Sequence, residues 1–352
     1  MITRLLSKLK SSPLAKKYIE PVITNLLEEN FHYNKNVIGT FTDSSGRKHE
    51  LYAGLRDRIK PGWQSMFDPK KTNRIPSGTE LKINLVEAER NIRSFKRALH
   101  SFNFDLKDKS VLEVGCHNGM KTFLLCREGC SNVTGSDVSF YYEKQLEANE
   151  KKEVDNYLDK LRGSVKNIFK EKDRQAIDNK VKFIEDDISN SNIKENSFDV
   201  IASWETLEHI IDVDSALNNM SRILKKNGIA FHEYNPFFSF NGGHSLCTLD
   251  FPWGHCRLNE NDFQRYLKEF RSNEIQLAES FYKNSLNRLT MKDLENSAQK
   301  AGLKVLTIIP FVKKAHLSIF NNHCFEEAKE HFVSLTPMDL ISPVVWVILK
   351  KN

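Results

Sequence analysis

The segment SVLEVGCHNGMKT (Ser110–Thr122) decides the fold. Its apolar run ends at Gly115, a short polar turn follows, and a helix-forming run begins after Gly119. A strand that passes through a glycine-rich turn directly into a helix can hold a nucleotide-like cofactor at the edge of a sheet. His117 stands where such turns favour glycine, but histidine is among the residues enriched at positive φ. The segment therefore predicts a cofactor loop with one unusual residue.

Short apolar runs and helix-forming runs alternate along the chain after residue 110. Strands are predicted over Val111–Gly115, Asn132–Asp137, Val181–Asp187, Phe198–Trp204, Ile229–Tyr234, Leu303–Pro310 and Val344–Lys350. The fifth of them follows a turn at Lys225–Gly228. Helices are predicted over Leu81–Phe102, Met120–Arg127 and about Phe325–Phe332. This alternation indicates an α/β protein with a doubly wound, mostly parallel sheet.

The turn Gly115-Cys-His-Asn-Gly119 does not fit the dinucleotide fingerprint, whose third glycine lets helix and strand close behind a pyrophosphate. The run E-V-G-C-x-x-G instead resembles the first motif of the class I S-adenosylmethionine (SAM)-dependent methyltransferases. The segment SFDVIASWETLEHI (Ser197–Ile210) resembles the fourth-strand exit of the ubiquinone-biosynthesis type. The resemblance covers about residues 108–236 well and 290–350 loosely. It implies SAM as cofactor and a seven-stranded Rossmann-like sheet with an antiparallel last strand.

The resemblance also implies the cofactor contacts. Asp137, 22 residues after Gly115, would accept hydrogen bonds from the ribose hydroxyls. Asp187, with Asp186 as the alternative, would face the adenine amino group, and Glu205 would meet the ammonium end. The complete expected set is Glu113, Gly115, Cys116, His117, Gly119, Asp137, Val138, Asp186, Asp187, Ile188, Ser203, Trp204 and Glu205.

An aromatic, histidine-bearing insert at 236–258 follows the fifth strand and offers catalytic groups. We expect His244 and His255 as general bases, Asp250 as the group that orients one of them, and Arg257 as a ligand for an anionic group. His209, Tyr234 and Trp253 complete the expected acceptor site. The competing interpretation is a satellite core whose histidines only hydrogen-bond within it.

A metal is not predicted. Soft ligands are present at His244, Cys247, His255 and Cys256, but their spacing, H-x2-C-x7-H-C, fits no standard zinc pattern.

Two regions are predicted along the 352 residues. Residues 1–105 are expected to form a mainly helical extension, whose basic first turns carry Ile2, Leu5, Leu6 and Leu9 at the spacing of an amphipathic docking helix. Residues 106–352 are expected to form the methyltransferase domain, with insertions at about 138–180 and 236–258.

Composition limits the partners. Hydrophobic residues make up 39% and charged residues 28%, and the net charge is +6, a mild value that does not favour a nucleic-acid partner. No run approaches the ~18 apolar residues of a membrane span, so no integral membrane contact is expected. Six scattered cysteines indicate reduced thiols and a cytoplasmic location. A homo-oligomer remains possible.

These features favour an enzyme that methylates a small polar molecule, such as a sugar, an acid or a secondary metabolite. The base candidates tilt the expectation slightly toward O-methylation. One alternative is an RNA methyltransferase, with phosphates bound by Arg56, Arg58, Lys60, Lys70, Lys71 and Arg74. Another is a non-catalytic binding module with a methyltransferase-like fold, for which His117 is the hint.

Overall fold

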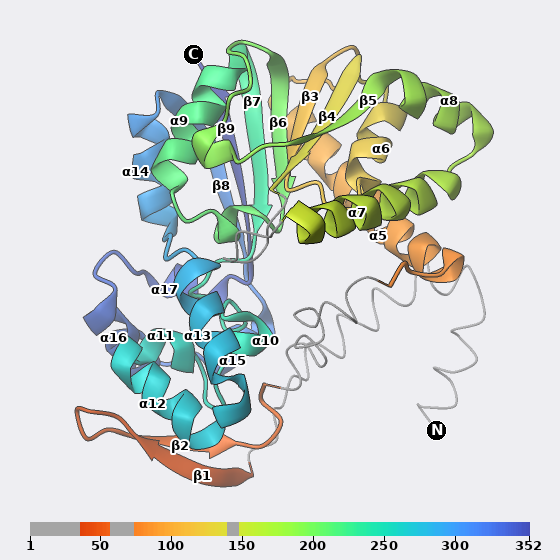
Figure 1. Cartoon of the computed structure of the whole chain (residues 1–352). Coiled ribbons are helices and arrows are strands. Elements are labelled where there is room, and N and C mark those ends of the chain that lie inside the picture. The colour runs from red at the N-terminus through yellow and green to blue at the C-terminus, as the bar shows by residue number, and fades with distance from the viewer. Residues whose placement is uncertain (1–35, 57–73, 139–147) are drawn as a thin grey trace, which may run out of the picture.

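The computed structural model describes residues 36–56, 74–138 and 148–352. They form two lobes, one above the other in Figure 1. The sheet lobe carries the central sheet with helices on both faces. The helical lobe consists of the hairpin β1 (Val37–Thr42) and β2 (Lys48–Tyr52) and the helices between residues 244 and 284 and between 314 and 341. The predicted N-terminal docking helix lies outside the described residues.

The sheet has seven strands in the order β5 (Val181–Glu185), β4 (Asn132–Asp137), β3 (Ser110–Val114), β6 (Phe198–Trp204), β7 (Leu224–Tyr234), β9 (Val344–Lys351) and β8 (Leu303–Phe311). The strands from β5 to β7 are parallel. Strand β9 is antiparallel to both of its neighbours. The predicted doubly wound sheet with an antiparallel last strand is therefore confirmed.

One strand begins earlier than expected. β7 starts at Leu224, and its pairing with β6 shifts register between Phe198 and Val200, so the predicted turn is an irregularity within the strand. Asn227 has a φ of 64° there. A Cβ on Gly228 would lie only 3.0 Å from the carbonyl oxygen of Asp199, which explains the glycine.

Helices α5 (Gly78–His100) and α6 (Met120–Arg127) cover one face of the sheet, and α9 (Val213–Ile223) and α14 (Met291–Lys300) cover the other. A capping box of Ser77 and Glu80 starts α5. Its Phe95 ring lies 5.4 Å from that of Trp204 and 4.8 Å from that of Phe231. Although α5 precedes residue 105, it contributes to the core of the sheet. The described part of residues 1–105 thus contains a β-hairpin as well as a helix, and the proposed domain boundary stays a prediction.

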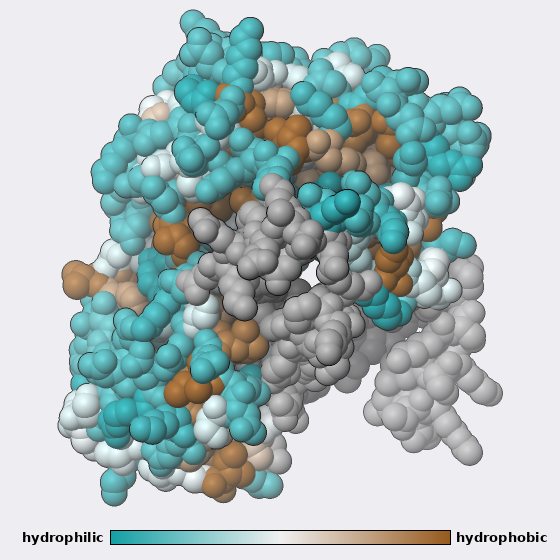
Figure 2. Space-filling model, viewed as in Figure 1, coloured by the Kyte–Doolittle hydropathy of each residue, from teal (hydrophilic) through white to brown (hydrophobic). Residues whose placement is uncertain are grey.

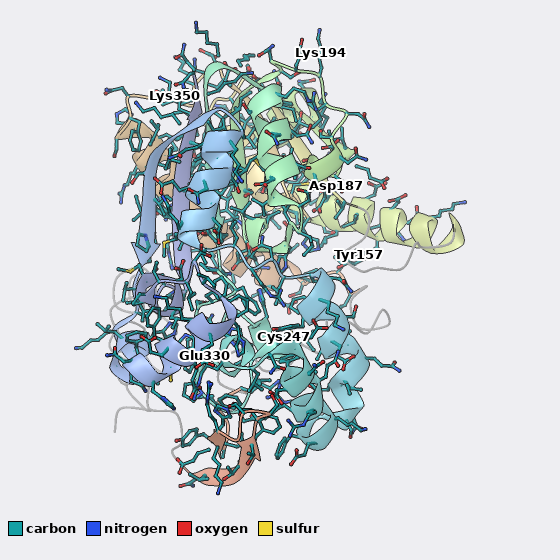
Figure 3. All side chains as sticks on the ribbon, turned by 90° about the vertical axis from the view of Figure 1, so that its left-hand side faces the viewer. Tyr157, Asp187, Lys194, Cys247, Glu330 and Lys350 are labelled. Atoms are coloured by element: carbon teal, nitrogen blue, oxygen red, sulfur yellow. The ribbon has the colours of Figure 1, made fainter. Side chains whose placement is uncertain are left out.

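The insertion between β4 and β5 contributes α7 (Ala148–Asn167) and α8 (Glu171–Lys180). In Figure 1, α7 crosses the end of the sheet that faces the helical lobe. In Figure 3, Tyr157 of α7 and Cys247 of the helical lobe lie on the two sides of the junction, and Lys194 and Lys350 lie at the opposite end of the sheet. That facing end carries the carboxyl termini of the parallel strands.

The helical lobe is much larger than the predicted 236–258 insert. It includes α10 (His244–Cys247), α11 (Gly254–Arg257), α12 (Glu260–Phe270), α13 (Ile275–Asn284), α15 (Lys314–Ile319), α16 (Asn322–His331) and α17 (Pro337–Ile341). It has a core of its own, centred on Phe237, Phe238, Phe240, Trp253 and Tyr266. The helix predicted near Phe325–Phe332 is α16, which begins three residues earlier.

The described surface in Figure 2 is mostly hydrophilic, with hydrophobic residues showing in small separate areas. Within the described ranges, no helix has the length and apolar character needed to cross a bilayer.

Within the helical lobe, a chain of buried polar contacts joins the hairpin to helices α11 and α16. Arg257 Nε donates to Glu327 over 2.6 Å, and its Nη2 lies 3.2 Å from His49 Nδ1. His49 Nε2 lies 3.0 Å from a carboxylate oxygen of Asp43. Burial lowers the pKa of His49, so its neutral ring accepts from Arg257 and donates to Asp43. Arg257, expected to bind the acceptor, instead neutralises a buried carboxylate.

We predict that Arg257→Met lowers the free energy of unfolding by about 3–5 kcal/mol, because the buried Glu327 loses its arginine and keeps only the contact with the exposed His323. Urea denaturation measures this. Lys283→Met, which removes the exposed ion pair with Glu260, is the control and should change stability little. A stable Arg257→Met protein with a weakened acceptor affinity would instead restore the original assignment.

Candidate functional site

The glycine-rich loop between β3 and α6 adopts the backbone that its glycines allow. Gly115 and Gly119 have φ of 74° and 72°, in the left-handed region. A Cβ on Gly115 would lie 2.2 Å from Thr206 Oγ1, so the loop packs directly against the exit of β6. A Cβ on Gly119 would lie 2.5 Å from the Phe183 ring. His117, between them, has a φ of 40° and takes the left-handed conformation without being glycine.

Asp137 ends β4 beside this loop. One carboxylate oxygen accepts a hydrogen bond from the backbone N–H of His117 over 2.6 Å, and the other accepts from the N–H of Val138 over 2.9 Å. These bonds fix the orientation of the carboxylate. Each carboxylate oxygen has further lone pairs, so the group can also accept from ribose hydroxyls. The contact of Asp137 with the ribose stays a prediction.

Glu113 lies beneath the loop and is almost completely buried. The Thr122 hydroxyl donates to its carboxylate. Burial raises the pKa of Glu113 to about 7, against the opposing effect of the Lys121 charge. The carboxyl group therefore sits between its neutral and ionised forms near neutral pH. Cys116 is also buried, which raises the pKa of its thiol.

The two acids after β5 differ in exposure. Asp187 is exposed, and its carboxylate accepts from the Ser189 N–H, capping the short helix η2 (Ile188–Asn190). Asp186 is half-buried, accepts from the Ser191 hydroxyl over 3.0 Å, and has a pKa raised by burial. Asp187 lies on the sheet lobe in Figure 3. Ile188 packs into the core under α9. The adenine contacts of these residues stay predictions.

Three residues at the end of β6 are expected to contact the cofactor, and only one of them has an exposed side chain. Ser203 Oγ lies 2.7 Å from His232 Nδ1 inside the sheet, and Trp204 packs in the core against Phe95. Glu205 is exposed at the strand end with a φ of 52°, and its N–H donates to the Glu233 carbonyl over 2.8 Å. Of these residues, Glu205 is therefore the one that can meet a cofactor through its side chain.

Glu208, His209 and His244 form a cluster at this edge. Their ligand atoms all lie within 4.8 Å of one another. Glu208 and His209 come from the short helix η3 (Leu207–His209), and His244 comes from α10 of the helical lobe. The two imidazole rings are 5.2 Å apart. His209 Nδ1 lies 2.6 Å from the Ser285 carbonyl, which accepts a hydrogen bond from it and so makes Nε2 the basic nitrogen of the neutral ring.

This cluster can accept a proton or hold a divalent metal ion. Sequence reasoning identified both histidines but missed Glu208 and predicted no metal. The available signal was the adjacent Glu208-His209 pair directly after a strand. Thr206, two residues earlier, touches the cofactor loop at Gly115, so the cluster lies beside that loop.

The other expected acceptor residues lie elsewhere. His255 is fully buried behind α10, with Nε2 2.8 Å from the Phe237 carbonyl. Trp253 donates from Nε1 to the Leu340 carbonyl over 3.0 Å. Asp250 lies 2.9 Å from Arg271 Nη2. Tyr234 is buried in the core under α9. His255, Trp253 and Asp250 thus make their contacts within the helical lobe, and its tertiary packing keeps them away from the cofactor loop.

A family model described as a methyltransferase domain matches residues 88–308, and the chain belongs to this family of SAM-dependent methyltransferases. The ubiquinone biosynthesis O-methyltransferase of Pelagibacter ubique (strain HTCC1062) is 32% identical over 170 residues. That match covers 48% of this chain and 58% of the relative, so the chain spans little more than half of the relative's length.

The chain also matches solved methyltransferase structures, including the following two. A SAM-dependent methyltransferase from Mesorhizobium loti is 11% identical, with 72% of this chain and 96% of that chain covered and a TM-score of 0.42. Geranyl diphosphate C-methyltransferase from Streptomyces coelicolor A3(2) is 12% identical, with 74% and 77% covered and a TM-score of 0.39.

We predict that Asp137→Asn lowers the affinity for SAM and for its demethylated product by about tenfold or more, because a neutral amide accepts hydrogen bonds more weakly. Calorimetric titration measures both. Asp178→Asn, which changes a carboxylate paired with Lys166 far from the loop, should bind both normally. Unchanged affinity in Asp137→Asn would show that another carboxylate holds the ribose.

A second prediction concerns pH. Because the pKa of Glu113 is about 7 in the folded protein and about 4.5 when unfolded, the folded state binds the proton more tightly. Its contribution to stability is complete below pH 4.5 and is lost as the pH rises to about 7, a change on the order of 3 kcal/mol. Urea unfolding of the wild type and of Glu113→Gln between pH 4.5 and 7 measures this, and the pH-dependent loss of unfolding free energy should be absent from the variant. If the two proteins instead lose stability in parallel, the prediction is contradicted.

Proposed function

We propose that this chain transfers the methyl group of SAM to a hydroxyl group of a small polar acceptor. The acceptor would bind where the helical lobe meets the carboxyl edge of the sheet. The observation that carries this proposal is the Glu208–His209–His244 cluster beside the cofactor loop. The name of the Pelagibacter relative, an O-methyltransferase, supports oxygen as the methylated atom.

SAM supplies a methyl group that is already activated by its positively charged sulfur. The chain's own part is mainly to orient the reactants, which can supply much of the rate. Gly115 and Gly119 allow close approach of the loop backbone, and Asp137 holds the ribose. His209 Nε2 or His244 takes the proton from the acceptor hydroxyl, a step that typically contributes 10²–10⁴-fold. Glu208 stabilises the imidazolium that results.

The same three side chains support a second way to activate the hydroxyl. A divalent ion held by Glu208, His209 and His244 would lower the pKa of a hydroxyl bound to it, so that no general base is needed. Two imidazoles and a carboxylate are suitable ligands for such an ion. Either route acts on a hydroxyl group, and the experiment below separates them.

The described residues give no support to the RNA alternative. Arg56 pairs with Glu274 over 2.5 Å, and Arg74 pairs with Glu80 over 2.7 Å. The other basic residues of that hypothesis, Arg58, Lys60, Lys70 and Lys71, lie outside the described residues. A small acceptor also agrees with the mild net charge of +6.

We predict that His244→Gln and Glu208→Gln lower kcat by about 10²-fold while the SAM affinity stays within a few-fold of wild type. Production of the demethylated cofactor is measured with a panel of sugars, hydroxy acids and catechol-type phenols. His100→Gln, at an exposed position of α5, is the control and should stay fully active. Full activity in both site variants would contradict the proposal.

A chelator distinguishes the two routes. Activity that is lost with EDTA and restored by Mg²⁺ or Mn²⁺ assigns the cluster to a metal. Activity that EDTA leaves unchanged, together with a kcat that falls at acid pH, assigns it to a histidine base.

A further inference from the structure

Helix α7 reaches the cofactor loop through Arg162. Its Nε donates to the carbonyl oxygen of His117 over 3.0 Å. The guanidinium carbon lies 4.2 Å from the centroid of the Phe183 ring, within the range of a cation–π contact. Nη2 lies 3.7 Å from Cys116 Sγ. An insertion that the sheet itself does not need thus contacts a loop 45 residues earlier in the chain.

His117 is the residue that this contact holds, and it is held on both sides. Its N–H donates to Asp137, and its C=O accepts from Arg162. Its φ of 40° is in the left-handed region, which costs a non-glycine residue about 1–2 kcal/mol. A residue in such a conformation persists when its surroundings over-determine it. The two hydrogen bonds provide that restraint.

The Phe183 ring packs between the loop and strand β4. A Cβ on Gly119 would lie 2.5 Å from this ring, and a Cβ on Gly135 would lie 2.8 Å from it. The ring therefore fills the space between the loop and β4. The Arg162 guanidinium packs on the same ring and donates a hydrogen bond to the loop backbone at His117. The loop therefore contacts both the Phe183 ring, at Gly119, and the Arg162 guanidinium, at the His117 carbonyl.

We propose that Arg162 is a positioning residue for the cofactor. By holding the His117 carbonyl, it keeps the loop in the conformation in which Asp137 can meet the ribose. It takes over the role that glycine would play at position 117, where the left-handed conformation would carry no cost. Arg162 acts through His117 and not on the reacting atoms. The inference rests on the proposed function, since it requires SAM binding.

A double-mutant cycle tests this mechanism. SAM and its demethylated product are titrated calorimetrically against the wild type and against Arg162→Met, Arg162→Lys, His117→Gly and the combination of His117→Gly with Arg162→Met. Lys160→Met, two residues away on α7 and exposed, is the matched control. Thermal unfolding of each variant confirms that it is folded. Lysine keeps the charge but lacks the planar fork, so Arg162→Lys should also lose affinity.

We expect Arg162→Met to weaken both ligands by about tenfold, the size of one charge-assisted hydrogen bond. In the His117→Gly background the same change should cost several-fold less. Normal affinity in Arg162→Met and Arg162→Lys would overturn the inference. An equal loss in both backgrounds would overturn it as well, because Arg162 would then act independently of His117. A wild-type protein that binds neither ligand would contradict the proposed function itself.

Discussion

The packing at the carboxyl edge of the sheet depends on three glycines whose lack of a Cβ allows close contact. At Gly115 a Cβ would collide with Thr206, and at Gly119 and Gly135 it would collide with Phe183. Only glycine lets the cofactor loop lie against both the exit of β6 and the ring that supports it. Because the loop touches Thr206, the Glu208–His209 pair two residues further on is brought beside it. An alanine at any of these positions would push apart segments that must meet.

The sheet could be predicted because its signals are local. Each strand carries its own apolar run, and the loop, Asp137 and α6 follow one another within 30 residues. The helical lobe could not, because its core joins Phe41, Phe263 and Leu340 from three distant stretches. The same limit explains the histidines. His244 and His255 share one aromatic insert and are both buried, and only tertiary packing brings His244 beside His209 and His255 against the Phe237 carbonyl.

The acidic residues at the carboxyl edge of the sheet favour a positively charged ligand. A chain with a net charge of +6 gathers Glu113, Asp137, Glu205 and Glu208 near its cofactor loop. Burying carboxylates is unfavourable, and the raised pKa of Glu113 reflects that cost. A bound cation offsets it, since an opposite charge favours the ionised form. SAM carries positive charge on its sulfur and its ammonium group, so the edge is prepared for this ligand more than for a phosphate-bearing dinucleotide.

Several residues at the carboxyl edge of the sheet have a positive φ although they are not glycine. Among the described residues, eight that are not glycine have positive φ, and four are asparagine or aspartate. Such residues tolerate that conformation. Three of the rest, His117, Glu205 and His244, lie at the carboxyl edge. Each has its N–H bonded, to Asp137, to the Glu233 carbonyl and to the Asn241 carbonyl respectively. Strained backbone held by its surroundings is typical of functional sites. Arg162 of α7 bonds the His117 carbonyl, and α10 of the helical lobe brings His244 beside His209. The two additions to the sheet therefore reach the same edge, one at the glycine-rich loop and the other at the exit of β6.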